Sequence, residues 1–239
     1  MTDNPSETRS NLLTVPWSDT VRFVRQLCHD LRNDLNALEL QSAYIGELTQ
    51  DQELTSEIKR LREVVSGLNS TLQLLSRAVG EVSPNLIAYP ASEFLADMRT
   101  QIERSFSQEN NEITWDVQLE DGMLNIDPQL FQEVFVELFT NALQHDRGKG
   151  PLVARARISD GRFLFSLHEP KAGFSSDTKS WGREPFRNIK QRHYGLGLNR
   201  VRAIVEAHGG ELKAQYDSEG ATLVSTIALP MSSRQSEHD

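Results

Sequence analysis

The stretch VRFVRQLCHDLRNDLNAL, residues 21–38, repeats apolar residues at alternating steps of three and four. The repeated positions are Val21, Val24, Cys28, Leu31, Leu35 and Leu38, and the pattern resumes at Ile45. Such a heptad pattern predicts a long helix that buries one face against partner helices. His29 and Asp30 lie just beside this face, so we expect both side chains to point toward solvent. An exposed imidazole beside a carboxylate is available for chemistry, but a lone histidine on a helix is usually an ordinary surface residue. The rest of the chain decides between these two interpretations.

A second heptad pattern follows the polar turn at residues 49–51. Its apolar positions are Leu54, Ile58, Leu61, Val65, Leu68, Leu72, Leu75 and Val79. Two long helices joined by a short turn form an antiparallel hairpin. One apolar stripe per helix gives too little core for a hairpin to stand alone. Pairing of two hairpins into a four-helix bundle solves this problem, so the sequence predicts a homodimer.

The pattern changes after Gly80, where Pro84 and Pro90 mark a linker. Beyond the linker, apolar periodicity predicts helices at residues 92–106, 127–145 and 198–208. Alternating residues predict strands at residues 113–119, 152–158, 162–168, 211–216 and 222–229. This order favours an α+β domain with helices on one face of a mixed sheet. The expected segments are a disordered tail (1–17), an all-α hairpin domain (18–82), the α+β domain (83–230) and a second disordered tail (231–239).

The composition narrows the class of protein. The net charge of −9 argues against nucleic acid as a partner, because phosphate contacts need clustered lysine and arginine. Cys28 is the single cysteine, which excludes an intrachain disulfide and favours a reducing compartment. No run of about 18 apolar residues is present, so no membrane span is expected. We therefore expect a cytoplasmic protein.

Two segments of the second domain carry residues suited to a nucleotide. Glu137 and Asn141 are four positions apart, so they share one face of a predicted helix. Such oxygen ligands suit Mg²⁺, which binds one or two protein groups together with substrate phosphates. Gly195-Leu196-Gly197-Leu198 opens the next helix, and glycines there let backbone N–H groups approach a phosphate. Each pattern alone also fits a purely structural role.

Two further segments complete the set. Residues 169–174 follow a predicted strand and form a possible loop at the edge of a ligand site. Glu184-Pro185-Phe186 lies in a polar stretch of about twenty residues between Gly173 and Gly195. A stretch of this length without regular structure is typical of a lid over a site.

In their order along the chain, these motifs resemble those of bacterial sensor histidine kinases. His29-Asp30-Leu31-Arg32-Asn33 resembles the phosphoacceptor box of the dimerisation and histidine-phosphotransfer hairpin. Residues 127–142 resemble the asparagine box of the ATP-binding domain of the GHKL type. Residues 169–174, 184–186 and 195–198 resemble its first glycine box, its phenylalanine box and its second glycine box. The resemblance extends from about residue 18 to residue 230.

The resemblance implies a role for each matched position. His29 would accept a phosphoryl group on Nε2, Asp30 would hold the ring tautomer and act as general base, and Asn33 would orient groups in transfer and phosphatase steps. Asn141 and Glu137 would bind Mg²⁺. The implied ATP contacts, besides Glu137 and Asn141, are Glu169, Lys171, Gly173, Gly195, Gly197, Leu198 and Thr222.

Several residues depart from the family pattern, two of them in the first glycine box. Glu169 stands where the family has an aspartate that contacts the adenine amino group, and Lys171 stands where it has a glycine. Lys171 would either meet a phosphate or narrow the adenine slot.

The leading interpretation is a cytoplasmic histidine kinase core. It would autophosphorylate His29 with Mg-ATP and pass the phosphoryl group to an aspartate of a response regulator receiver domain. The first alternative is a kinase-derived histidine phosphotransferase with a degenerate ATP site, which the two departures favour. The second alternative is a scaffold or inhibitor of two-component signalling that performs no chemistry.

Overall fold

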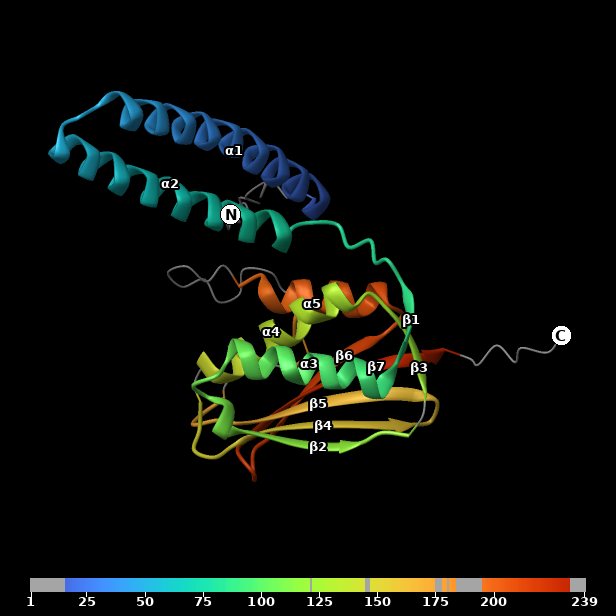
Figure 1. The fold of residues 1–239 in the computed structure, drawn as a ribbon. Helices are drawn as coiled ribbons and strands as arrows, with labels where there is room; N and C mark the ends of the chain where they lie inside the picture. Colours follow the sequence, from blue (N-terminus) through green and yellow to red (C-terminus); the bar gives the residue numbers. More distant parts are fainter. Residues whose placement is uncertain are drawn as a thin grey trace, which may run out of the picture. The chain divides into compact units, whose positions relative to one another are not determined.

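The computed structural model describes residues 16–120, 122–144, 147–174, 178–179, 181–183 and 195–232. The chain divides into two compact units, one ending at Gly80 and the other beginning at Glu81. Figure 1 shows a helical hairpin in the first unit and a sheet with helices in the second. Within the described residues, the helices lack the combination of length and apolar character that a bilayer crossing requires.

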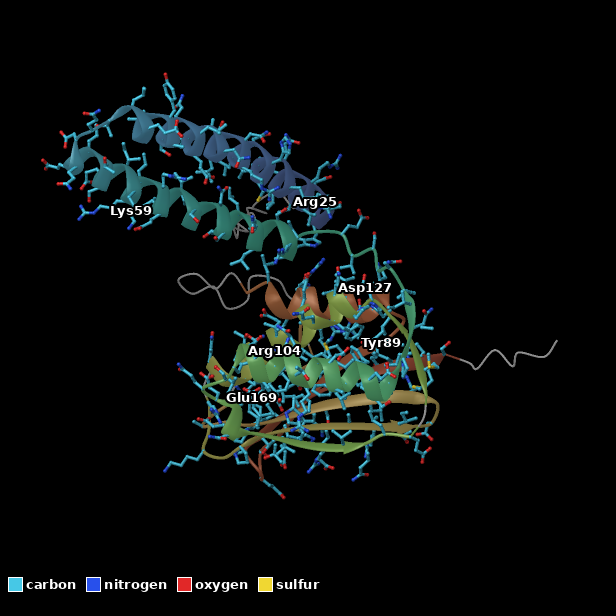
Figure 2. All side chains as sticks on the ribbon, viewed as in Figure 1. Arg25, Lys59, Tyr89, Arg104, Asp127 and Glu169 are labelled. Carbon is cyan, nitrogen blue, oxygen red and sulfur yellow. The ribbon has the colours of Figure 1, made fainter. Side chains whose placement is uncertain are left out.

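The first unit is an antiparallel hairpin of α1 (Trp17–Leu48) and α2 (Gln52–Ala78) (Figure 1). Asp51 begins α2, because its side chain accepts hydrogen bonds from the backbone N–H groups of Glu53 and Leu54. At the other end of the hairpin, Arg25 Nε donates to the carbonyl of Val79 at 3.2 Å. Arg25 is labelled on α1 in Figure 2. The hairpin is therefore fixed at both of its ends.

The single apolar seam expected on each helix is divided into two rows. On α1, the buried row consists of Cys28, Leu35 and Ser42. A second row on α1, also spaced by seven residues, stays 40 to 47 % exposed: Leu31, Leu38 and Ile45. On α2, Val65 is buried, and a row stays 45 to 49 % exposed: Leu54, Leu61 and Leu68. One hairpin therefore leaves part of its apolar seam exposed.

The second unit is built on a seven-stranded mixed sheet. Its strands are β1 (Ile87–Pro90), β2 (Ile113–Gln118), β3 (Met123–Ile126), β4 (Leu152–Ser159), β5 (Arg162–Pro170), β6 (Glu211–Asp217) and β7 (Thr222–Ser232). Their order is β1-β3-β7-β5-β4-β2, and β6 also pairs with β7. The pairing of β2 with β4 is parallel, whereas the other pairings are antiparallel.

Three helices cover one face of this sheet: α3 (Ala91–Ser105), α4 (Pro128–Gln144) and α5 (Gly197–Ala207) (Figure 1). The strands alternate, so that Phe163, Phe165 and Leu167 of β5 are buried while their neighbours are partly exposed. Phe94 of α3 meets Phe131 of α4 edge to face, at 5.6 Å between ring centroids. The predicted architecture, an all-α hairpin followed by an α+β domain with its helices on one face of the sheet, is confirmed.

Asp127 joins three segments at the start of α4 (labelled in Figure 2). Its carboxylate accepts hydrogen bonds from the backbone N–H groups of Gln129 at 3.0 Å and Leu130 at 3.1 Å, and from Asn85 in the linker at 2.9 Å. The backbone N–H of Asp127 donates to Nε2 of His208, the C-cap residue of α5, at 3.0 Å. Asp127 therefore caps α4 and fixes the far end of α5 beside it.

We expect Asp127→Ala to lower the free energy of unfolding by about 1 to 2 kcal/mol at neutral pH, as for other lost helix caps. Partial burial raises the pKa of Asp127, but hydrogen bonds from Asn85, Leu130 and Gln129 outweigh it and lower the pKa. The stabilisation should be complete above about pH 4, the range of an unfolded aspartate, and should vanish as pH falls through the lower folded pKa. Urea unfolding of wild type and Asp127→Ala at neutral and acidic pH measures this loss of stability. A difference in unfolding free energy that does not change with pH would contradict the role of the Asp127 carboxylate.

Candidate functional site

His29 lies on the exposed side of α1, as the sequence predicts. Its side chain is 65 % exposed, and that of Asp30 is 58 % exposed. His29 Nδ1 lies 3.2 Å from Asp30 Oδ1 and 3.5 Å from Asn33 Nδ2. The three predicted catalytic residues therefore meet within one turn of the helix.

The two contacts at Nδ1 favour different tautomers of the ring. Asp30 can only accept a hydrogen bond when ionised, so its contact requires a proton on Nδ1, whereas Asn33 Nδ2 would donate to a bare Nδ1. The Asp30 contact is shorter and charge-assisted, so we assign the Nδ1–H tautomer. This hydrogen bond lowers the pKa of Asp30, helped by a second one from Gln26 Nε2 at 2.8 Å. The lone pair of Nε2 is then the nucleophile of this ring.

In the second unit, α4 and α5 approach closely at Glu137 and Gly197. A Cβ atom added to Gly197 would lie 1.7 Å from Glu137 Oε1 and 2.3 Å from its Cδ. Only glycine leaves room for the carboxylate at this position. Asn141 Nδ2 donates to Glu137 Oε1 at 3.2 Å. The amide oxygen of Asn141 is an acceptor and can serve as a metal ligand. One carboxylate and one amide oxygen are the donors that Mg²⁺ prefers.

The N-terminal turn of α5 has the backbone groups that bind an anion. The helix begins at Gly197 with Leu196 as its N-cap, and Leu196 makes no side-chain capping bond. Gly195 before it has a φ of +64°, which glycine adopts without strain. The first backbone N–H groups of a helix lack partners within it and carry partial positive charge. Gly195, Gly197 and Leu198 thus form a turn that can receive a phosphate.

Glu169 and Lys171 form a buried ion pair at the end of β5. Their side chains are 7 % and 6 % exposed, and Lys171 Nζ contacts Glu169 Oε1. Backbone hydrogen bonds of 2.8 Å hold this segment on both sides, from Lys171 N–H to the carbonyl of Ala221 and from Gly148 N–H to that of Pro170. Glu169, labelled in Figure 2, is the penultimate residue of β5. Lys171 is therefore directed at Glu169, an arrangement that the sequence did not reveal.

The remaining predicted positions lie around these two clusters. Thr222 is opposite Pro170 in the β5–β7 ladder, and its hydroxyl donates to the carbonyl of Gly220 at 2.8 Å. Gly173 follows two residues after Lys171, and an added Cβ would meet open space there. Leu198 packs against the hydrophobic core. The predicted phenylalanine box, residues 184–186, lies outside the described residues.

A hollow of about 510 Å³ opens beside the turn that follows α4. It is lined by Asn111, Glu112, Arg147, Gly148, Gly150 and Pro151. None of the predicted site residues lines it, so the hollow lends no support to the predicted site.

One anchoring contact was missed from the sequence. Arg202 of α5 is 9 % exposed, and its guanidinium donates to the carbonyls of Trp181, at 2.6 and 3.0 Å, and Leu212, at 2.9 Å. Asn199 Nδ2 donates to the carbonyl of Gly182 at 3.2 Å. These bonds fix residues 181–182 to α5. The sequence does show an arginine beside the apolar stripe of this helix, but it does not indicate which groups the arginine contacts.

Part of the second unit matches a known protein family. Residues 126–233 match a family described as "Histidine kinase-, DNA gyrase B-, and HSP90-like ATPase". The match includes α4, α5 and the four strands from β4 to β7. The predicted site residues of the second unit all lie within it.

Curated relatives extend the similarity to both units. The chain is 27% identical over 222 residues to an uncharacterized sensor-like histidine kinase of Rhizobium meliloti (strain 1021), covering 86% of this chain and 42% of the relative. It is 27% identical over 228 residues to sporulation kinase E of Bacillus subtilis (strain 168), covering 90% of this chain and 29% of that protein. It is 28% identical over 214 residues to the sensor histidine kinase ZraS of Escherichia coli (strain K12), covering 86% and 44%. The chain spans less than half the length of these relatives.

A solved structure has the same fold. The crystal structure of full-length ShkA in complex with AMPPNP superimposes with a TM-score of 0.66. The superposition covers 89% of this chain and 46% of ShkA, at 20% sequence identity. The likeness concerns the fold of the chain.

The buried Glu169–Lys171 pair should be sensitive to the loss of one charge. We expect Lys171→Met to lower the free energy of unfolding by about 3 kcal/mol, because a buried carboxylate loses the ammonium beside it. Replacing both charges, as Glu169→Gln with Lys171→Met, should restore most of that stability. Urea unfolding of the full chain measures both effects.

Lys213→Met supplies the matched control. Lys213 pairs with Glu211 at 3.0 Å, but its side chain is 70 % exposed. Its loss should therefore leave unfolding almost unchanged. A Lys171→Met variant as stable as the control would contradict the buried pair.

Proposed function

We propose that this relative of the bacterial sensor histidine kinases, with its histidine kinase-type ATPase domain, is the catalytic core of such a kinase. Residues 18–82 form the phosphoacceptor domain and residues 83–230 the ATP-binding domain. The core transfers the γ-phosphoryl group of Mg-ATP to His29. The phosphorylated histidine then donates this group to an aspartate of a response regulator receiver domain. The protein works in the cytoplasm, where a lone cysteine stays reduced.

The geometry of His29 is the observation that carries this proposal. The described contacts of its ring end on Nδ1, and Asp30 accepts the Nδ1 proton. The exposed Nε2 lone pair can therefore approach a phosphorus atom in line with the leaving group. The N–P bond forms as the bond from the γ-phosphorus to the bridging oxygen breaks, and ADP leaves. Asp30 stabilises the positive charge that the ring gains in this step.

The geometry of the second unit supports the proposed ATP-binding roles. The backbone N–H groups at Gly195, Gly197 and Leu198 contact the phosphates, and little covalent chemistry beyond positioning and charge neutralisation is needed. Asn141 and Glu137 fit Mg²⁺, which supplies charge neutralisation of the phosphates when bound. The base end of the nucleotide lies at four residues: Glu169, Lys171, Gly173 and Thr222.

His29→Gln tests the proposal. The full chain is incubated with γ-labelled ATP and Mg²⁺, and acid-labile, base-stable label is measured. We expect the variant to lose all label while it stays folded, because residue 29 lies on the exposed side of α1. His168→Gln, a change in the other unit, should keep the label.

Label that persists in His29→Gln would show that another residue accepts the phosphoryl group. A wild-type chain that gains no label from ATP, but gains it on His29 from a phosphorylated receiver domain, would instead establish the phosphotransferase.

The phosphoacceptor hairpin acts as a homodimer in this proposal. Leu31, Leu38 and Ile45 of α1 stay exposed in one hairpin, as do Leu54, Leu61 and Leu68 of α2. Both rows have the seven-residue spacing of a bundle interface. A second copy of the hairpin would cover them and complete a four-helix bundle.

Leu38→Asp with Leu61→Asp should therefore give monomers, because each change places a charge in the proposed interface. Light scattering of the full chain measures the mass. Leu40→Asp is the control, since Leu40 is 73% exposed and lies on the other side of α1. It should remain a dimer. A wild-type chain that scatters as a monomer at micromolar concentration would rule out this assembly.

A further inference from the structure

The N-terminal turn of α5 has an anionic neighbour that comes from another helix. The first turn of α5 contains no acidic residue, and Leu196 makes no capping bond. Instead, the carboxylate of Glu137 on α4 lies against Gly197, within the volume that a Cβ atom would fill. An acidic group at a helix N-terminus is favourable because the free N–H groups carry partial positive charge.

Other contacts keep this carboxylate in place. Asn141 donates to Glu137 Oε1 from the next turn of α4. Glu133, one turn before it on the same helix, is directed toward Arg200 at 3.5 Å. Asp127 and His208 hold the opposite ends of α4 and α5 together. Glu137 is thus the acidic side chain of α4 that the packing places at Gly197.

This position is the one that phosphates take in the proposed function. A bare triphosphate at the α5 N-terminus would meet a carboxylate only a few ångströms away, and like charges at such distances repel. A divalent cation between the two anions turns this repulsion into a net attraction, because carboxylate, amide and phosphate oxygens are all ligands for the cation. The charge of Glu137 therefore acts differently on the two forms of the nucleotide.

We propose that Glu137 is a specificity-determining residue that occupies the phosphate position before the nucleotide arrives and admits only a cation-chelated triphosphate. This inference rests on the proposed function. It adds that the carboxylate of Glu137 excludes metal-free ATP, beyond any part it has in holding Mg²⁺. Glu137→Gln keeps the size of the side chain and the contact with Gly197, but removes the repelling charge.

Calorimetry of the full chain tests this with two probes, ATP in EDTA and ATP with excess Mg²⁺. Wild type should bind Mg-ATP at least about tenfold more tightly than metal-free ATP. Glu137→Gln should bind metal-free ATP about tenfold more tightly than wild type does, and Mg-ATP more weakly, so that the preference collapses. Glu93→Gln removes one negative charge from the exposed first turn of α3 and should behave as wild type.

A second variant guards against misfolding of the first. Glu137→Asp keeps the charge but withdraws it from Gly197 by one methylene, so it should still exclude metal-free ATP. Urea unfolding of each variant checks that the fold is intact. If Glu137→Gln is unfolded, the Glu137→Asp variant decides the question. A Glu137→Asp variant that binds metal-free ATP as tightly as Mg-ATP would overturn the inference.

The outcomes separate this inference from the proposed function. Wild type that binds both nucleotide forms equally would overturn the inference alone. So would a folded Glu137→Gln variant that excludes metal-free ATP as strongly as wild type. Wild type that binds neither form and gains no label on His29 would overturn the proposed function and this inference together.

Discussion

The close approach of α4 to α5 is the constraint on which the second unit depends. Gly197 lets the carboxylate of Glu137 lie against the first turn of α5. At the opposite ends of the same helices, the backbone N–H of Asp127 donates to His208 Nε2, and His208 Nδ1 donates to the carbonyl of Ile204 at 2.7 Å. The two helices are therefore held together at two points, and the carboxylate of Glu137 lies beside the first turn of α5.

The proposed acceptor, His29, depends on a different and more local kind of order. His29, Asp30 and Asn33 belong to one turn of one helix, so the helix alone brings them together. The proposed nucleotide site combines residues of α4, α5, β5 and β7, which are far apart in the sequence. Its geometry therefore requires the whole sheet to form. In the proposed function, one helix is therefore enough to position the nucleophile, whereas the phosphate and metal contacts need the folded second unit.

The same difference decides what the sequence could predict. The long helices, the sheet with its helical face and the exposure of His29 all follow from periodicity that spans many residues. β1 and β3 were missed because four residues carry too little alternation to recognise. The division of each hairpin seam into a buried and an exposed row depends on how the helices rotate against each other. The pairing of Lys171 with Glu169 and of Arg202 with Trp181 depends on tertiary contacts, which spacing along the chain does not encode.

In the proposed mechanism, the N-terminal turn of α5 receives the phosphates under the control of Glu137. A crystal structure of the full chain with Mg²⁺ and a non-hydrolysable ATP analogue tests it most directly. We expect phosphate oxygens within hydrogen-bonding distance of the backbone N–H groups of Gly195, Gly197 and Leu198, and a metal ion held by Glu137 and Asn141. Phosphates bound away from α5, or a Glu137 carboxylate still lying against Gly197 with no metal beside it, would contradict the account.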